Sequence, residues 1–200
     1  MMKETKKKNV GFLEKEVKIL SHVNEIGIAL SEIYVKSPKN KPKLKSFEYV
    51  NHSNIIFKLD GKTIKLRRYN ITGKGNNSEY ELIIKTKANN KKTGLKERIE
   101  QQTKITKEIF CGVHEFIRIA FPKNYHTYNM RKLRYSFDKF VVDICKVEST
   151  AKEKIPTYVE IELKDNKNDI TNVKKFIKKL CPDIDVSKIV FSTRGISNLK

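Results

Sequence analysis

Two short segments of the sequence carry pairs of glutamates spaced two residues apart. Glu14 and Glu16 form the first pair, Glu160 and Glu162 form the second, and apolar residues alternate with the charges in both segments. A period of two indicates a β-strand with both carboxylates on one face. Either pair alone is also compatible with a solvated strand face. Four converging carboxylates would repel one another unless they shared a cation. Because carboxylate oxygens suit Mg²⁺ or Mn²⁺, we predict these four glutamates as ligands of such a metal.

Basic residues repeat at the same spacing in the segments between the two acidic pairs. Five consecutive predicted strands would each place charges on a single face, which favours a channel lined by cations on one side and carboxylates on the other. Such a channel fits a metal-bound triphosphate, since lysine and arginine bind phosphate oxygens. The residues that we predict to bind phosphate are Lys18, Lys65, Arg67, Lys85, Arg98, Lys132 and Arg134.

The chemistry expected of this set is hydrolysis at a terminal phosphoryl group. Metal and cations would neutralise the charge that grows on that group, and a glutamate would orient the attacking water. We predict Glu100 for the water, with Arg98, Lys85 and Arg134 as the catalytic cations. The sequence contains neither a P-loop nor a Gly-x-Ser-x-Gly nucleophile motif, so those two classes of enzyme are excluded.

Composition points to a polyanionic partner. The formal net charge is +20, from 43 Lys and Arg against 23 Asp and Glu, which favours RNA, DNA, polyphosphate or nucleotides without choosing among them. The three cysteines and four histidines lack ligand spacing, which argues against a zinc knuckle or a disulfide framework and for a reducing compartment. No apolar run approaches the roughly 18 residues of a membrane span, so no membrane partner is expected.

The remaining periodicity predicts the elements that position these residues. Period-two patterns followed by turn residues give an up-and-down antiparallel meander, and closure removes its exposed edges. The expected fold is α+β, a closed eight-stranded antiparallel β tunnel barrel with flanking helices, spanning residues 11–200 after a basic flexible arm over 1–10. Strands are expected at 12–20, 47–59, 62–69, 79–87, 95–105, 128–137, 140–147 and 157–163, with 188–194 as a last edge strand or tail.

Three helices and four turns complete this prediction. Ser21 is expected to cap a helix with Val23, Ile26, Leu30, Ile33 and Tyr34 on its apolar face. A second helix over 109–120 should cover the barrel and end before Pro122, and a third should occupy 169–180. Turns are expected at 60–61, 73–77, 89–94 and 138–139.

The motifs, taken in order, resemble the triphosphate tunnel metalloenzyme superfamily, which includes CYTH-domain proteins and the metal-dependent RNA triphosphatases of mRNA capping. The resemblance covers about residues 12 to 180. It is carried by the Glu-x-Glu-x-Lys of Glu14 to Lys18, the two basic residues Lys65 and Arg67, the Tyr-Glu-x-x-x-Lys of Tyr80 to Lys85, and the Arg-x-Glu of Arg98 to Glu100.

Three later segments are more similar to the RNA triphosphatase branch found in fungi, protozoa and large DNA viruses. Lys132 to Phe137 is similar to its Lys-x-Arg-x-Ser-Tyr motif. Val142 to Val147 resembles an Asp-Leu-Thr-x-Val segment, with Cys145 at the threonine position. Tyr158 to Leu163 is similar to the closing Tyr-Glu-x-Glu-x-Glu-Leu, with Val159 in place of the first glutamate. The loop over 148–156 also suits this branch better than compact CYTH proteins.

This resemblance implies an RNA 5′-triphosphatase that removes the γ-phosphate before guanylyl transfer, with Mg²⁺ or Mn²⁺ as cofactor. Triphosphate-ended RNA would be the partner, in the nucleus, the cytoplasm or a viral factory. A guanylyltransferase Lys-x-Asp-Gly motif does not occur, so capping would need a separate guanylyltransferase chain. Hydrolysis of tripolyphosphate, thiamine triphosphate or nucleoside triphosphates is the alternative within this fold. A non-catalytic RNA- or polyphosphate-binding protein is the alternative from another class, and the oligomeric state is open.

Overall fold

Nine strands, three α-helices and one short 3₁₀ helix make up the part of the chain that the structure describes. The computed structural model describes residues 12–73, 77–88, 96–149, 156–165 and 169–192. The predicted arm over 1–10 and the predicted turn over 89–94 lie outside these residues, as does part of the turn over 73–77. The strands are β1 (Phe12–Ile19), β2 (Ser46–Leu59), β3 (Lys62–Ile71), β4 (Glu79–Lys87), β5 (Lys96–Ile105), β6 (Tyr125–Ser136), β7 (Phe140–Ser149), β8 (Tyr158–Leu163) and β9 (Phe191–Ser192). The helices are α1 (Val23–Lys36), α2 (Lys107–Ala120), α3 (Ile170–Leu180) and the 3₁₀ helix Val186–Lys188.

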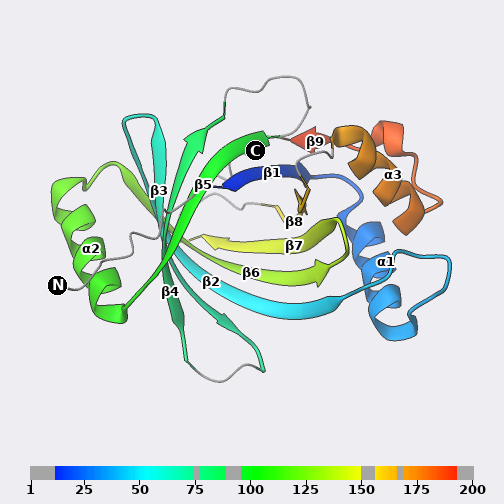
Figure 1. Ribbon diagram of the computed structural model, residues 1–200, viewed down its shortest axis with the longest axis horizontal. Coiled ribbons are helices and arrows are strands. Elements are labelled where there is room, and N and C mark those ends of the chain that lie inside the picture. Colours follow the sequence, from blue (N-terminus) through cyan, green and yellow to red (C-terminus); the bar gives the residue numbers. More distant parts are fainter. Residues whose placement is uncertain (1–11, 74–76, 89–95, 150–155, 166–168, 193–200) are drawn as a thin grey trace, which may run out of the picture.

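The sheet closes on itself through β1. Its strand order is β5-β4-β3-β2-β6-β7-β8-β1-β9, and an additional pairing joins β5 to β1. Strands β1 to β8 therefore form a closed antiparallel barrel, with the short β9 beside β1 (Figure 1). The predicted α+β class and the predicted eight-stranded barrel are confirmed. Within the described residues, the last predicted segment contributes the two residues of β9.

Because side chains alternate along each strand, every strand has one face toward the lumen of the barrel, which is largely polar, and one face toward the outside, which is largely apolar. On β1, Val17 and Ile19 point outward into a buried core, while Glu14, Glu16 and Lys18 point inward and are also buried. Because side chains directly opposite in an antiparallel pair share a face, the register carries this assignment from strand to strand. The inner face thus carries the charges, together with a smaller apolar cluster of Tyr128, Met130, Cys145, Val147 and Tyr158.

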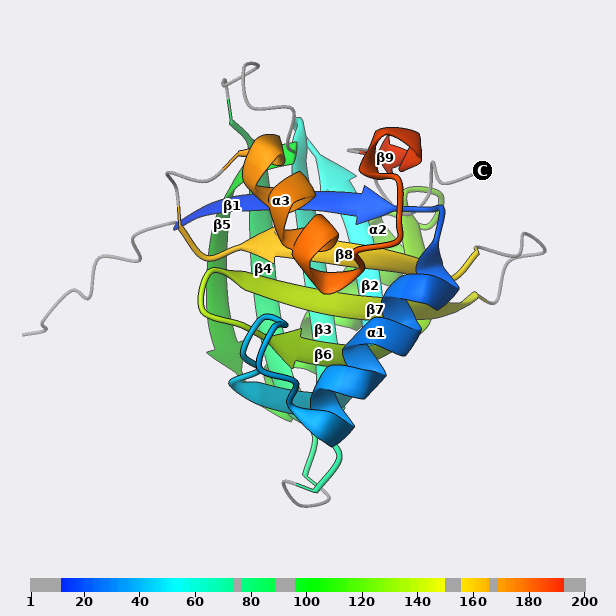
Figure 2. The ribbon, with the colours of Figure 1, turned by 90° about the vertical axis from the view of Figure 1, so that its right-hand side faces the viewer.

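Helices α1 and α3 cover the outer face of β1, β8, β7 and β6 (Figures 1 and 2). Leu30 of α1 and Ile177 of α3 are fully buried there with Val17, Val142 and Ile161 of the strands. This cluster is the main apolar core, and it fixes the wall that carries both acidic pairs. Within the described residues, no helix has the length and apolar character needed to cross a lipid bilayer.

Helix α2 packs on the other side of the barrel and covers it less completely than predicted. Ile117 is fully buried against the outer faces of β2 and β3, where it meets Leu66. Ile109, Phe116 and Ile119 are at least half exposed. The apolar residues of α2 therefore span a wider arc than its contact with the barrel, and only part of the predicted face is inward.

The predicted cap of the first helix is wrong. The hydroxyl of Ser21 accepts a hydrogen bond from the backbone N–H of Val190 at 3.0 Å, so it is committed to the segment leading into β9. His22 precedes the helix with a φ of 53°, and its side chain makes no capping bond. Tyr34, expected on the buried face, is mostly exposed and packs its ring against Phe47 instead.

Two predicted hairpin turns are confirmed. Asp60 and Gly61 join β2 to β3 with φ values of 49° and 73°, the two positive angles that a type I′ turn requires. Asp138 and Lys139 join β6 to β7. Beside that turn, the backbone N–H of Phe137 donates to the carbonyl of Phe140 at 2.8 Å. Both turns leave the lumen-facing residues of their strands in register.

The difference between the two helical surfaces generates a stability prediction. Ile177→Ala removes a fully buried side chain of α3 and should lower the free energy of unfolding by about 2–5 kcal/mol. Ile119→Ala makes the same change on the exposed side of α2 and should alter it by about 0.5 kcal/mol or less. Urea unfolding followed by circular dichroism compares the pair. Equal losses in the two variants would contradict the assigned core.

Candidate functional site

The structure brings all of the predicted site residues to the lumen of the barrel. They lie on the inner faces of β1, β3, β4, β5, β6 and β8, at positions related by direct or diagonal register. Most of them are buried despite their charge. The residues concerned are Glu14, Glu16, Lys18, Lys65, Arg67, Lys85, Arg98, Glu100, Lys132, Arg134, Glu160 and Glu162.

Three carboxylates crowd together on β1 and β8. Glu16 lies directly opposite Glu162, and Glu14 is the next inward residue of β1. Burial and the charge of Glu16 raise the pKa of Glu14. Burial and the charge of Glu14 raise the pKa of Glu162 to about 7. Burial is the larger cause of both shifts, and the neighbouring glutamate adds to each.

Two cations from β4 and β5 hold the β1 pair. The ammonium of Lys85 lies 2.6 and 2.7 Å from the two carboxylate oxygens of Glu14 and 2.5 Å from Glu100. The guanidinium of Arg98 donates to Glu16 at 2.7 Å, and its Nε is 3.4 Å from Glu14. Glu100 and Arg98, predicted to act on water and phosphate, therefore lie beside the predicted metal ligands.

Glu160 has a different environment from the other three glutamates. One of its oxygens is 3.0 Å from the ammonium of Lys18 and the other is 3.0 Å from that of Lys132. Burial alone would raise the pKa of Glu160, but Lys132 and Lys18 outweigh it and hold that pKa well below 4.5. Glu160 is therefore a fully ionised carboxylate shared by two buried lysines.

Asp143 of β7 is the main site residue that the sequence analysis did not predict. Its carboxylate accepts hydrogen bonds from Nε and Nη2 of Arg134, both at 2.9 Å, and from the ammonium of Lys132 at 2.7 Å. Burial would raise its pKa, but Lys132 and Arg134 lower it. The available signal was an acidic residue between Val142 and Ile144 in a strand that follows the basic one.

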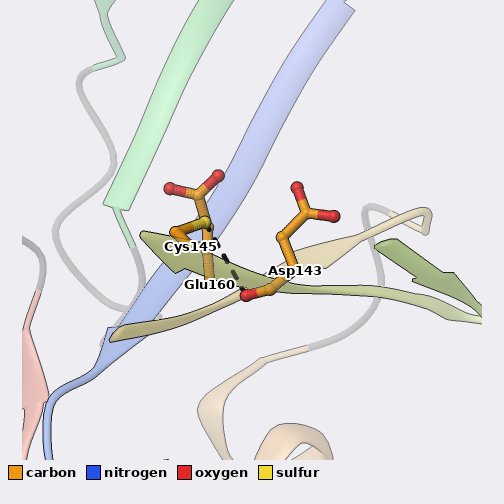
Figure 3. Close-up of side chains that lie close together, drawn as sticks. All are labelled: Asp143, Cys145 and Glu160. Atoms are coloured by element: carbon orange, nitrogen blue, oxygen red, sulfur yellow. Dashed lines mark hydrogen bonds between the residues drawn. The ribbon is translucent and has the colours of Figure 1, made fainter. Parts of the chain in front are cut away.

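Asp143, Cys145 and Glu160 lie close enough together to suggest a second metal site, which the chemistry does not support (Figure 3). One ligand atom from each falls within 4.8 Å of the others. The ammonium of Lys132 already contacts both carboxylates. Burial raises the pKa of the Cys145 thiol, so the sulfur stays protonated. A lysine-neutralised acid pair beside a neutral thiol does not fit a hard divalent cation.

Strands β3 and β6 each carry two cations on the inner face of the barrel. Lys65 and Arg67 extend from β3, and Lys132 and Arg134 extend from β6. Lys65 is buried and, within the described ranges, has no carboxylate partner at ion-pair distance; its ammonium lies 6.0 Å from the ring centre of Tyr128. Burial and the charge of Arg67 lower the pKa of Lys65 well below 10.5. An anion in the lumen would relieve this repulsion.

Glu14, Glu16 and Glu162 are neighbours in the register, although among the described residues only Asp143, Cys145 and Glu160 have ligand atoms all within 4.8 Å of one another. The three register neighbours offer only carboxylate oxygens, which Mg²⁺ and Mn²⁺ prefer. Their mutual repulsion, seen in the raised pKa values of Glu14 and Glu162, is what a bound divalent cation would cancel. The lumen thus combines a candidate cation site with a candidate anion site.

Comparisons with known proteins support the fold. No protein-family model matches the chain, and no curated protein matches it significantly in sequence. A conserved hypothetical protein from Pyrococcus furiosus superposes with a TM-score of 0.61 at 16% identity, over 94% of this chain and 99% of that one. A "putative adenylate cyclase" from Vibrio parahaemolyticus gives 0.53 at 13% identity, over 94% and 98%. At such identities the likeness shows a shared fold alone.

A third solved structure is named for the activity that the motif resemblance implies. It is the RNA triphosphatase domain of a mimivirus mRNA capping enzyme, with a TM-score of 0.44 at 18% identity, over 84% of this chain and 86% of that one. This score is too low to carry an argument about fold or function.

The raised pKa of Glu162 predicts an unusual dependence of stability on pH. Because the folded pKa of about 7 exceeds the ordinary 4.5, the folded state binds more protons in this window, and stability falls as pH rises through it. Glu162→Gln should therefore stabilise the metal-free protein at pH 8, by about 1–3 kcal/mol, and change little at pH 5. Thermal unfolding in EDTA at both pH values measures this.

Glu160→Gln is the matched comparison and should have the opposite effect. It leaves Lys18 and Lys132 without their shared carboxylate, so it should destabilise the protein at pH 8 by about 3 kcal/mol. Glu115→Gln on the exposed surface of α2 serves as a neutral control. A loss of stability in Glu162→Gln comparable to that in Glu160→Gln would contradict the distinction between the two glutamates.

Proposed function

We propose that this chain is a metal-dependent RNA 5′-triphosphatase of mRNA capping. The single observation that supports it most is the division of the closed lumen. Crowded carboxylates lie on β1 and β8, and the buried cation Lys65 lies on β3, on the far side of the closed strand order. A triphosphate bound through a divalent cation balances both sides at once, which neither a bare metal nor a bare anion does.

The acidic side would hold the cofactor. Glu14, Glu16 and Glu162 are the residues proposed to bind Mg²⁺ or Mn²⁺, and the bound ion would supply charge neutralisation on the phosphate oxygens. Glu160, predicted from the sequence as a fourth ligand, is proposed instead to position Lys18 and Lys132 toward the substrate. Two lysines hold the pKa of Glu160 well below 4.5, whereas the pKa of Glu14 is raised despite its contact with Lys85.

The cationic residues would bind the phosphate chain. Lys65 and Arg67 of β3 lie on the far side of the strand order from β8. Lys132 and Arg134 of β6 contact the acidic residues of β7 and β8. Lys18 lies on β1 beside Glu16. Guanidinium groups present a planar fork that matches phosphate oxygens, and lysines add point charges. These groups would hold the terminal phosphoryl group in place and exclude bulk water from it.

Glu100 is proposed to orient the attacking water. It is buried and fixed by Lys85, the same lysine that holds Glu14. Its carboxylate can accept a proton from a water molecule aimed at the terminal phosphorus. Lys85, Arg98 and Arg134 would stabilise negative charge that develops on the phosphoryl oxygens during transfer.

RNA is the proposed substrate because charge and motif order point the same way. The net charge of +20 favours a long polyanion, and the outer face of α3 exposes Lys174, Lys175, Lys178 and Lys179. The segments on β6, β7 and β8 carry the resemblance to RNA triphosphatases of mRNA capping. A capping role would require a separate guanylyltransferase chain as partner.

A small triphosphate is the second candidate substrate. Lys65 stands where the superfamily more commonly has arginine, and Val159 and Cys145 depart from the motifs of the RNA triphosphatase branch. These departures are compatible with tripolyphosphate, thiamine triphosphate or a nucleoside triphosphate as the substrate. A substrate panel separates the candidates: γ-phosphate release from triphosphate-ended RNA, tripolyphosphate, thiamine triphosphate and ATP, with Mg²⁺ and with Mn²⁺. The ATP reactions are also assayed for cyclic AMP. RNA binding without phosphate release from any substrate would favour a non-catalytic protein.

Metal addition should stabilise the protein through the three proposed ligands. A concentration of Mn²⁺ about 100 times its Kd should add about 2.7 kcal/mol to the free energy of unfolding. Glu14→Gln and Glu162→Gln should abolish this gain, while Glu160→Gln should retain it. Thermal unfolding with EDTA or Mn²⁺ provides the measurement. An unchanged gain in Glu162→Gln would remove that residue from the metal site.

Glu100→Gln should slow turnover without weakening metal binding. Loss of the water-orienting carboxylate is expected to lower kcat by about 10²-fold or more. The rise in melting temperature with Mn²⁺ should persist, because the three proposed ligands are intact. Glu115→Gln should leave both kcat and the metal response unchanged. Full activity in Glu100→Gln would assign the role of general base to another residue.

A further inference from the structure

Two polar side chains of β2 lie buried in the lumen without hydrogen-bond partners. His52 is 4% exposed and Asn54 is 2% exposed. Across the part of the chain that the structure describes, no protein group bonds to either ring nitrogen of His52 or to the amide nitrogen or oxygen of Asn54. Buried polar groups are normally paired, and an unpaired one costs stability. The unpaired polar atoms of His52 and Asn54 are therefore explained either by a bound ligand or by a structural role.

The position of β2 explains what these side chains face. β2 pairs with β3 on one side and with β6 on the other, and both neighbours carry cations. Asn54 lies directly opposite Arg67. His52 lies opposite Tyr69 and Met130, so Arg67 and Lys132 are its diagonal neighbours on the same face. Diagonal side chains are within reach of long residues. His52 and Asn54 thus form a floor between two cationic strands.

His52 is an uncharged donor in this setting. Burial and the positive charges of Lys132 and Arg67 lower its pKa far below 6.5, and Lys65 and Arg134 add to the shift. The ring therefore stays neutral and offers one N–H donor, while the amide of Asn54 offers two. Neutral donors can bind an anion where one more cation would be repelled. The ring of Tyr69 lies beside the imidazole, with the ring centroids 6.0 Å apart and an interplanar angle of 28°.

The carboxylates of this side of the lumen are already committed to other residues. Asp143 accepts from Lys132 and Arg134, and Glu81 accepts from Gln102 at 2.6 Å and from Arg67 at 3.4 Å. The missing partner must therefore bring its own acceptor oxygens and negative charge. Non-bridging oxygens of a phosphoryl group meet both requirements.

We propose that His52 and Asn54 form a phosphate-oxygen subsite on the floor of the tunnel, between Arg67 and Lys132. The identity of the anion, a phosphoryl group of a triphosphate, rests on the proposed function. The cations supply attraction from several directions, and the two fixed neutral donors select one orientation of the phosphoryl group. No sequence motif identified either residue.

The subsite is tested by the binding of inorganic tripolyphosphate to metal-free protein, measured by isothermal titration calorimetry. His52→Phe and Asn54→Leu keep similar volumes and remove the donors. Each should weaken binding tenfold or more. Each should also leave the melting temperature equal to or above that of the unaltered protein, because an unpaired buried polar group has been removed. His52→Gln, which restores a neutral donor, should recover part of the affinity.

Asn51→Leu is the matched control, since Asn51 lies on the same strand with its side chain on the outer face. It should bind tripolyphosphate like the unaltered protein. Unchanged affinity in both His52→Phe and Asn54→Leu overturns the subsite. So does weaker binding with a lowered melting temperature and no recovery in His52→Gln, because that result describes a structural role.

The same experiment separates the subsite from the proposed function. Tripolyphosphate binding that depends on His52 and Asn54, in a protein that hydrolyses no triphosphate, supports the subsite and overturns the enzyme. If hydrolysis and tripolyphosphate binding are both unchanged in His52→Phe and in Asn54→Leu, the subsite alone is overturned. No measurable binding of tripolyphosphate to the unaltered protein, with or without Mg²⁺, overturns both.

Discussion

Burial of charge inside a closed sheet is the constraint on which this structure depends. Closing the barrel removes the inner faces of eight strands from bulk water, and those faces carry lysines, arginines and carboxylates. A buried ion without a partner costs far more than a paired one, so each strand must align its charges with those of its neighbours. Glu14 opposite Arg98 and Arg134 opposite Asp143 show that the register satisfies this demand. What remains unbalanced is confined to two opposed regions of the lumen.

The fold could be predicted because each strand alternates with a period of two. Apolar outer residues and charged inner residues give an unambiguous pattern, and a shift of one residue would reverse it. Local features that depend on distant segments were beyond the sequence. Ser21 looks like a helix cap, but its hydroxyl serves the backbone of Val190, which is 169 residues away in the chain. The buried face of α2 likewise depends on how much of the barrel wall it meets.

Most of the charged residues in the lumen were predictable, but their individual roles were not. Alternation predicts which face of a strand a side chain occupies. It does not predict the position along the barrel axis, which decides which residues of other strands the side chain meets. Glu160 and Glu162 share a strand and a face, yet two lysines neutralise the first while the second faces other carboxylates. Asp143, His52 and Asn54 had no charged spacing to distinguish them. Their roles emerge only when β2, β6 and β7 are side by side.

The pairing of β1 with both β5 and β8 has a consequence for how the protein folds. The first strand lies between partners that follow it by about eighty and one hundred and fifty residues, as the pairs Glu14 with Arg98 and Glu16 with Glu162 illustrate. Contacts between such distant parts of a chain are costly in entropy and form slowly. A growing chain on the ribosome can assemble the β2–β5 meander early, but the acidic wall exists only after β8 has emerged. The candidate site therefore assembles only after Leu163, the last residue of β8, has been synthesised.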